Sequence, residues 1–315
     1  MKRQAAQAIE QRSAIPARNG SGPRPRVVES APVRAVADAN PVNAGDDLPR
    51  ASSTLFDIPI ELAQPAQMLR MITGWAGQGE TRRVMYVNAH VVNQSRERPE
   101  LADALRSADL VYCDGYGVRM AASTLNLPVP HRMTGADWVW GVASLCELTG
   151  ESLYLLGSDP PLAREAAKRL QRWYPRLEIA GYHHGYSEFD TPQNERVIED
   201  INACRPGIVL VGMGTPKQEL WIDRYAHRLE ADVLWSVGAL FDYLAGRVPR
   251  APRWLADNGL EWIFRLAIEP QRMWRRYLLG NPAFLARVLS ARRERDARNG
   301  APVAPRGPQA PVLDQ

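Results

Sequence analysis

The chain has 315 residues, of which 45% are apolar and 23% charged, and its formal net charge is +4. This size allows one large α/β domain with an appendage, and three cysteines are too few for a disulfide-rich framework. No apolar run approaches the roughly 18 residues of a membrane-spanning helix, and the first residues lack the apolar centre of a signal peptide. These features predict a protein of the cytosol or of the cytosolic membrane surface.

Both ends of the chain have the composition of linkers. Residues 1–50 contain six prolines and no sustained apolar period, and residues 299–315 are rich in Ala, Pro and Gly. Such segments bury too little apolar surface to fold alone, so we expect both to be disordered. The folded part should begin near Leu55, because apolar residues alternate from Phe56 to Ile60 as in one strand.

Apolar runs then alternate with amphipathic runs up to residue 245. The predicted strands are Val84–Asn88, Leu110–Cys113, Leu153–Leu156, Glu178–Gly181, Ile208–Val211 and Val233–Val237. The predicted helices are Ala66–Ala76, Pro99–Ser107, Gly117–Leu125, Ala136–Cys146, Leu162–Tyr174, Asn194–Ala203 and Gln218–Leu229. This rhythm predicts a Rossmann-like α/β core over 51–245, in which helices sandwich a parallel sheet.

The most informative loop follows the fifth predicted strand. Gly212 and Gly214 let backbone N–H groups approach a ligand, and the next helix start adds a partial positive charge. Lys217 adds a full charge, and Gln218 and Glu219 can hold a sugar or ribose. The loop therefore predicts a site for a phosphorylated ligand. The alternative is a strand–turn–helix whose glycines serve only packing.

Polar residues near other strand ends should meet this loop, because the carboxyl ends of parallel strands share one edge of a sheet. They are Asn88, His90 and Asn93, then Thr134, Gly135 and Asp137, then Gly157 and Ser158. His90 could be a base, a ligand contact or a core histidine.

Asp114 follows the second strand directly, with glycines beside it. A partly buried carboxylate can act as a general base when its pKa rises toward working pH. The alternative is an N-cap of the helix that begins near Gly117.

No metal or other cofactor is expected, because the sequence has no D-x-D, H-E-x-x-H or paired C-x-x-C motif. A Rossmann oxidoreductase is an alternative interpretation of Gly212 and Gly214. Its glycine fingerprint is incomplete, since Lys217 occupies the third position, and the next strand ends without an acid for the ribose.

The segment 246–298, called the appendage below, has a different composition. It carries twelve Arg, no Lys, two Asp and three Glu, which is a net +7, together with three Trp. Arginines with interfacial aromatics at helical spacing are typical of a membrane-surface helix, so an anionic inner-membrane surface is the expected partner. Helices packed on the core without lipid are one alternative, and a non-catalytic membrane scaffold is another. A nucleic-acid partner is not expected, because no recognised motif is present.

Five strings occur in order: CDGYGV, RMTGADW, VGMGTPKQELW, VGALFDYLAG and RAPRWLADNGLEWIFRLAIEPQRMWRR. Together they resemble the WecG/TagA/CpsF glycosyltransferases, glycosyltransferase family 26, over roughly Phe56 to Leu289. The resemblance implies an inverting transferase that moves a sugar from a UDP-sugar to a polyprenyl-diphosphate-linked saccharide. It also implies a peripheral protein at the cytoplasmic face of the inner membrane, in surface polysaccharide or teichoic acid synthesis. N-acetylmannosamine, N-acetylmannosaminuronic acid and glucose all fit as the donated sugar, and a homo-oligomer is compatible with it.

The resemblance implies roles for single residues. Asp114 matches the catalytic base, and Gln218 matches a glutamine that contacts the substrate. Asn88 matches the Asn of a Thr-x-Asn pair, although Tyr86 stands where the Thr would be. The arginines that close the site at the membrane match Arg265, Arg272 and Arg275. A helix would place these three roughly on one side, but Pro270 should kink or restart it.

Overall fold

Six parallel strands form the central sheet, in the order β4-β3-β8-β7-β5-β6. They are β3 (Arg82–Val87), β4 (Leu110–Cys113), β5 (Leu153–Gly157), β6 (Ile179–His183), β7 (Ile208–Gly212) and β8 (Val233–Ser236). Four of them, β4, β5, β7 and β8, are buried at every residue, because helices cover both faces. The predicted strands and the Rossmann-like fold are therefore confirmed, with strand ends moved by at most two residues.

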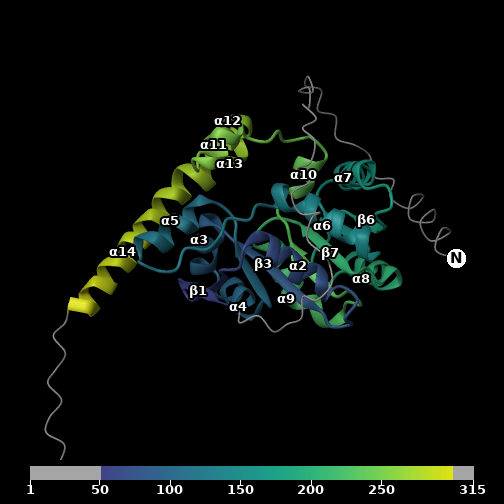
Figure 1. Cartoon of the computed structure of the whole chain (residues 1–315), viewed down its shortest axis with the longest axis horizontal. Helices are drawn as coiled ribbons and strands as arrows, with labels where there is room; N and C mark the ends of the chain where they lie inside the picture. Colours follow the sequence, from purple (N-terminus) through teal and green to yellow (C-terminus); the bar gives the residue numbers. More distant parts are fainter. Residues whose placement is uncertain (1–50, 301–315) are drawn as a thin grey trace, which may run out of the picture.

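This computed structural model describes residues 51–300 (Figure 1). The disorder expected over 1–50 and in the C-terminal tail lies outside the described residues, except that the last helix includes residues 299 and 300.

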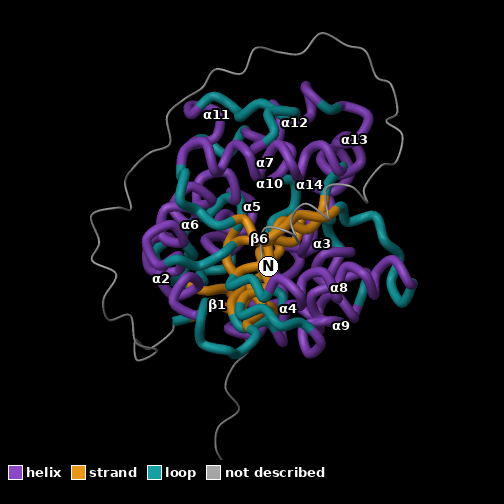
Figure 2. Tube along the Cα trace, turned by 90° about the vertical axis from the view of Figure 1, so that its right-hand side faces the viewer, coloured by secondary structure: helices purple, strands orange, loops and turns teal. Residues whose placement is uncertain are grey.

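Helices flank the sheet on both sides (Figure 2). On one side lie α2 (Pro65–Trp75) and α6 (Gly135–Thr149), and on the other α4 (Pro99–Ser107), α8 (Pro192–Cys204) and α9 (Lys217–Tyr225). The remaining core helices are α3 (Ala89–Glu97), α5 (Tyr116–Thr124), α7 (Pro160–Trp173), α10 (Leu240–Leu244) and a short 3-10 turn, Ala226–Arg228. In the core, Trp138 of α6 stacks on Trp235 of β8 with ring centroids 3.8 Å apart.

The start of the described chain is a hairpin, and the prediction of one strand there was wrong. Strand β1 (Ser52–Leu55) pairs antiparallel with β2 (Ile58–Glu61). The turn uses Phe56 and Asp57, with φ of 52° and 66°. Non-glycine residues seldom adopt this left-handed region, so the composition gave no sign of the turn.

Helix α3 was also not predicted, because its residues were interpreted as a polar loop. The Asn88 Oδ1 atom accepts hydrogen bonds from the backbone N–H groups of His90 and Val91. Asn88 is thus the N-cap of α3, which is a common use of Asn.

The appendage is helical and breaks where expected. It contains α11 (Arg253–Asp257), α12 (Glu261–Ile268), α13 (Pro270–Trp274), a π-helical stretch (Arg275–Leu279) and α14 (Gly280–Gly300). Pro270 starts α13 as its first residue, so the predicted restart is confirmed. Helix α14 runs along the core past α5 and then projects beyond it (Figure 1).

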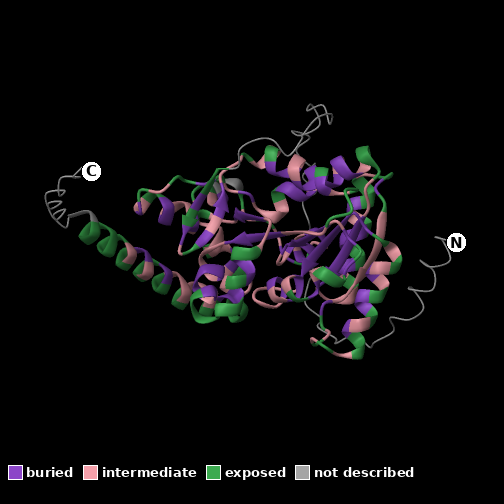
Figure 3. Ribbon diagram, turned by 90° about the horizontal axis from the view of Figure 1, so that it is seen from below, coloured by how far each residue is buried: buried purple, intermediate pink, exposed green. Residues whose placement is uncertain are grey.

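Helix α14 buries Phe284 and Val288, and the Phe284 ring meets Phe56 of the hairpin edge-on at 6.3 Å. Its distal half is largely exposed (Figure 3). Over residues 51–300, no helix combines the length and apolar content needed to cross a bilayer.

Candidate functional site

Two adjoining cavities open at the carboxyl edge of the sheet. The inner cavity measures about 420 Å³ and the wide cavity about 1030 Å³. Both are lined by Tyr86, His90, Gly238, Ala239, Arg265 and Arg276, so they adjoin each other. The polar loops after the strands thus meet at one edge, but they divide between two cavities.

The predicted site residues fall into three groups. The inner cavity is lined by Asn88, His90, Asp114, Thr134, Gly135 and Arg265. The wide cavity is lined by His90, Asn93, Ser158, Gly212, Gly214, Lys217, Arg265, Arg272 and Arg275. Neither cavity is lined by Asp137, Gly157, Gln218 or Glu219.

Asp114 lies half-buried at the end of β4, where its Oδ2 accepts a 3.3 Å hydrogen bond from Asn88 Nδ2. Burial raises the pKa of Asp114 to about 6, and the nearby Glu261 carboxylate adds to this, while Asn88 and Arg276 oppose it. The N-cap of α5 is Gly115, and no side chain caps that helix, so the cap alternative for Asp114 is not supported. Near neutral pH this carboxylate is ionised yet more basic than an ordinary aspartate, as a general base requires.

Asn88 connects helix α3 to Asp114. Its oxygen caps α3, which leaves its amide nitrogen free to donate to the carboxylate. His90 follows in the first turn of α3, where burial and the Arg276 charge lower its pKa to about 4. His90 is therefore neutral at physiological pH and is a poor general base.

The glycines near the β7 loop differ in role, since one permits a turn beside a ligand and others permit close packing. Gly214 has φ +81° and open space where a Cβ would lie, which fits a turn beside a ligand. A Cβ on Gly157 would lie 2.3 Å from the Gly212 carbonyl oxygen, so Gly157 allows β5 and β7 to approach closely, and a Cβ on Gly212 would lie 2.9 Å from the Phe241 ring. Gly157, which was expected at the site, thus serves packing, whereas Gly212 serves packing and also lines the wide cavity.

Gln218 and Glu219 are fully buried behind the loop. The Gln218 Oε1 atom accepts from the backbone N–H groups of Gly214 and Gly238 at 3.2 and 3.0 Å. Its Nε2 donates to the Tyr86 hydroxyl and to Glu219. These two side chains brace the loop, while Lys217 stays at the wide cavity and donates to the Gly185 carbonyl.

Three predicted site residues attach the appendage to the core. Asp137 accepts from Thr134 and pairs with Arg132 and with Arg250 of the appendage. Asn93 donates to the Gly280 carbonyl at the start of α14, at 2.7 Å. The third is Arg265.

The predicted arginines differ in how they are neutralised. Arg265 is 8% exposed, donates to the Tyr243 hydroxyl at 2.7 Å and pairs with Glu269 at 2.8 Å. Arg272 pairs with the same glutamate at 2.9 Å and with Asp242 at 3.5 Å. Arg275 lies 5.2 Å from the Trp274 ring, and no carboxylate among residues 51–300 pairs with it.

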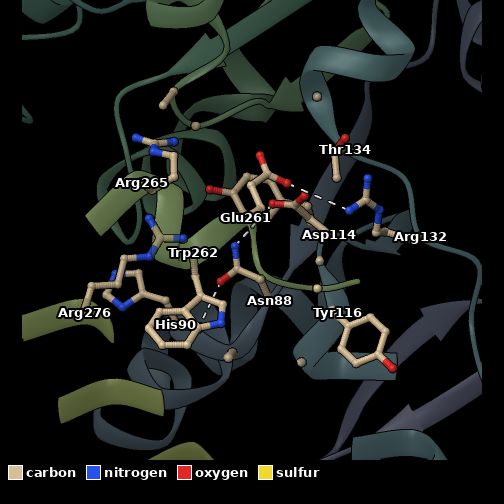
Figure 4. A pocket seen from close by; sticks show the side chains of 18 of the residues that line it. Asn88, His90, Asp114, Tyr116, Arg132, Thr134, Glu261, Trp262, Arg265 and Arg276 are labelled. Carbon is tan, nitrogen blue, oxygen red and sulfur yellow. Dashed lines mark hydrogen bonds and ion pairs between the residues drawn. The ribbon is translucent and has the colours of Figure 1, made fainter. Parts of the chain in front are cut away.

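Sequence reasoning missed three charged residues of the inner cavity, Arg132, Glu261 and Arg276 (Figure 4). Glu261 begins α12 and reaches Arg132 at 3.9 Å. Arg276 faces both cavities, and its buried Nε has no hydrogen-bond partner in the described structure. Arg276 adjoins Arg275 in the sequence, but the family resemblance pointed only to Arg275.

The wide cavity has an excess of positive charge. Its lining includes six cations, Lys217, Arg247, Arg265, Arg272, Arg275 and Arg276, against three carboxylates, Glu97, Asp159 and Asp242. Such a lining favours an anionic ligand, and arginine in particular matches the geometry of phosphate oxygens. Among residues 51–300, no three His, Cys, Asp or Glu side chains are grouped to hold a metal ion.

Residues 53–298 match the family model described as "Glycosyl transferase WecG/TagA/CpsF family". The chain belongs to this family. Among its relatives is the N-acetylglucosaminyldiphosphoundecaprenol N-acetyl-beta-D-mannosaminyltransferase of Staphylococcus aureus, strains NCTC 8325 / PS 47, COL and MW2. Each is 29% identical over 230 residues, which cover 72% of this chain and 88% of the relative. This WecG/TagA/CpsF chain is thus a glycosyltransferase, as the resemblance implied, and not an oxidoreductase or a non-catalytic scaffold.

Proposed function

We propose that this glycosyltransferase moves a hexosyl group from a UDP-sugar to a saccharide on a polyprenyl diphosphate, with inversion. The relatives are named for transfer of N-acetylmannosamine to N-acetylglucosaminyldiphosphoundecaprenol. We therefore assign N-acetylmannosamine as the preferred donated sugar, ahead of N-acetylmannosaminuronic acid and glucose, and N-acetylglucosaminyldiphosphoundecaprenol as the acceptor. One observation carries the proposal. The cationic wide cavity adjoins the inner cavity, where Asp114 has a raised pKa.

The wide cavity is assigned to the UDP-sugar. Its cations exceed its carboxylates, and Gly214 and Lys217 lie at the amino end of α9, where backbone N–H groups favour phosphate oxygens. Tyr186, at the rim, is 61% exposed and offers an aromatic face on which a base can stack.

The inner cavity is assigned to the acceptor hydroxyl. The Asp114 carboxylate removes the hydroxyl proton, and the acceptor oxygen attacks the anomeric carbon from the face opposite the diphosphate. The bond from this carbon to the phosphate oxygen breaks, and UDP leaves with the electron pair. One displacement inverts the anomeric centre. Lys217, Arg275 and Arg276, which have no carboxylate ion pair in residues 51–300, are the cations assigned to the leaving diphosphate.

The lipid part of the acceptor is assigned to the appendage. Eight of the thirteen exposed large apolar side chains of the described chain belong to it. Such a surface fits a peripheral protein at the cytoplasmic face of the inner membrane, where polyprenyl diphosphates present their head groups.

The test is transfer itself. Each of the three UDP-sugars is incubated with a short-chain polyprenyl-diphosphate N-acetylglucosamine, and products are read by mass spectrometry. We expect one added hexosyl unit, and an inverted anomeric configuration by NMR. Retention of configuration, or no transfer from any of the donors, would contradict the proposal.

A further inference from the structure

Glu261 has no role in the mechanism above, yet it lies in the inner cavity. It comes from the first turn of α12, so the appendage supplies it to a cavity whose base belongs to the core. In Figure 4 the carboxyl groups of Glu261 and Asp114 point into the same part of the cavity. Arg132 lies on one side of them and Arg276 on the other.

The charges around Asp114 come from several elements. Tyr86 and Asn88 face it from β3 and its end, Arg132 from the loop before α6, and Glu261 and Arg276 from the appendage. Tyr112 and Cys113 precede it on its own strand, and burial raises the pKa of both, so neither carries charge at neutral pH.

Among these groups Glu261 is the carboxylate that repels the ionised form of Asp114. The repulsion is limited because Glu261 also pairs with Arg132 at 3.9 Å. A like charge nearby makes proton uptake more favourable, so it increases the strength of a base.

We propose that Glu261 is a positioning residue that acts through Asp114: docking of the appendage brings a second carboxylate into the inner cavity and makes Asp114 a stronger base. The proposal rests on the proposed function, in which Asp114 takes the acceptor proton. It couples the chemistry to the appendage, because without the Glu261 carboxylate Asp114 would be a weaker base.

The test is the pH dependence of kcat/KM for the full-length Glu261→Gln variant. Removing the carboxylate should lower the pKa of Asp114, so the acid limb of the profile should move down by about half to one pH unit. The plateau rate should fall a few-fold, because a weaker base accepts the proton less readily. Glu261→Asp should return the limb toward the wild-type position. The matched control is Glu294→Gln, which removes an exposed carboxylate of α14 outside both cavities and should leave the profile unchanged.

Arg276→Gln gives an independent test of opposite sign. Arg276 lowers the pKa of Asp114, so its removal should move the acid limb to higher pH, whatever the loss in rate. If Glu261→Gln proves unstable in thermal unfolding, Glu261→Ala is measured in its place, and an unmoved limb in that variant overturns the proposal.

An unchanged acid limb in a folded Glu261→Gln variant also overturns it, including the case in which only KM for the acceptor rises. The proposed function has a separate test. Near-normal turnover by the Asp114→Asn variant would refute the assignment of Asp114 as the general base. Loss of turnover in Asp114→Asn with an unmoved limb in Glu261→Gln would refute only the role of Glu261.

Discussion

Asp114 occupies a position that is unfavourable for its charge. Its pKa is raised from 3.8 to about 6, chiefly by burial, so the folded state disfavours the carboxylate. The resulting loss in the free energy of unfolding is zero below pH 4, grows between pH 4 and 6, and is complete above pH 6. A residue kept at such a cost fits a role in the reaction better than a role in folding.

Asp114→Asn tests the base, because it keeps the shape and removes the basicity. Turnover should fall by about 10²–10⁴-fold, with UDP-sugar affinity little changed in calorimetry. The melting temperature at pH 7 to 8 should rise slightly, and this gain should vanish toward pH 4 for the reason given above. A variant that turns over normally, or that melts lower at neutral pH, would favour a structural role for Asp114.

At the scale of elements, the break between α12 and α13 places a carboxylate beside two of the appendage arginines. Glu269 lies between the two helices and binds Arg265 and Arg272, so it neutralises part of the charge of both. The π-helical stretch after α13 then turns Arg275 and Arg276 to the wide cavity without a carboxylate partner in the described chain. These two are the appendage arginines best placed to meet a diphosphate.

Arg275→Gln should therefore reduce kcat by about 10- to 100-fold, the usual effect of one lost charge-assisted hydrogen bond. The matched control is Arg293→Gln, an exposed arginine of α14 that lines neither cavity. Steady-state kinetics with saturating lipid acceptor measures both. Equal kcat values for the two variants would show that Arg275 contributes only to the general charge of the surface.

The sequence predicted the elements better than their contacts. Continuous apolar runs identified the strands β4, β5, β7 and β8, because these parallel strands are buried on both faces. The end of β3 was interpreted as loop because its polar residues were assigned to a ligand, although Asn88 is an ordinary helix cap. The neighbourhood of Asp114 and Glu261 depends on how two distant segments dock, and no local spacing encodes that.

For the whole molecule, the apolar and charged surfaces of the appendage lead us to expect binding to a membrane surface. Exposed Trp254, Trp274, Leu278 and Leu279 accompany a net charge of +7 over 246–298. Apolar side chains insert into a bilayer and cations attract its anionic lipids, and only the second attraction is screened by salt.

The full chain should sediment with anionic vesicles more than with neutral ones. Raising salt from about 0.1 M to 1 M shortens the screening length from about 10 Å to 3 Å, so binding should weaken but not vanish. The double change Leu278→Ser and Leu279→Ser should remove most of the binding that persists at high salt. The matched control is Leu148→Ser, which changes an exposed leucine of α6 outside the appendage and should bind as the wild type does. Equal binding to neutral and anionic vesicles at low salt would refute the electrostatic part.

The contact between Phe56 and Phe284 has a consequence for biosynthesis. The ribosome makes the hairpin before the main sheet and α14 after it, so the surface that receives Phe284 is made long before its partner. Glu261 and Arg276 also emerge after every strand of that sheet. A nascent chain can thus acquire its Asp114 pocket and its Gly214 loop before it has the groups that complete the inner cavity. The order of translation itself delays the reactive arrangement until the appendage has been made.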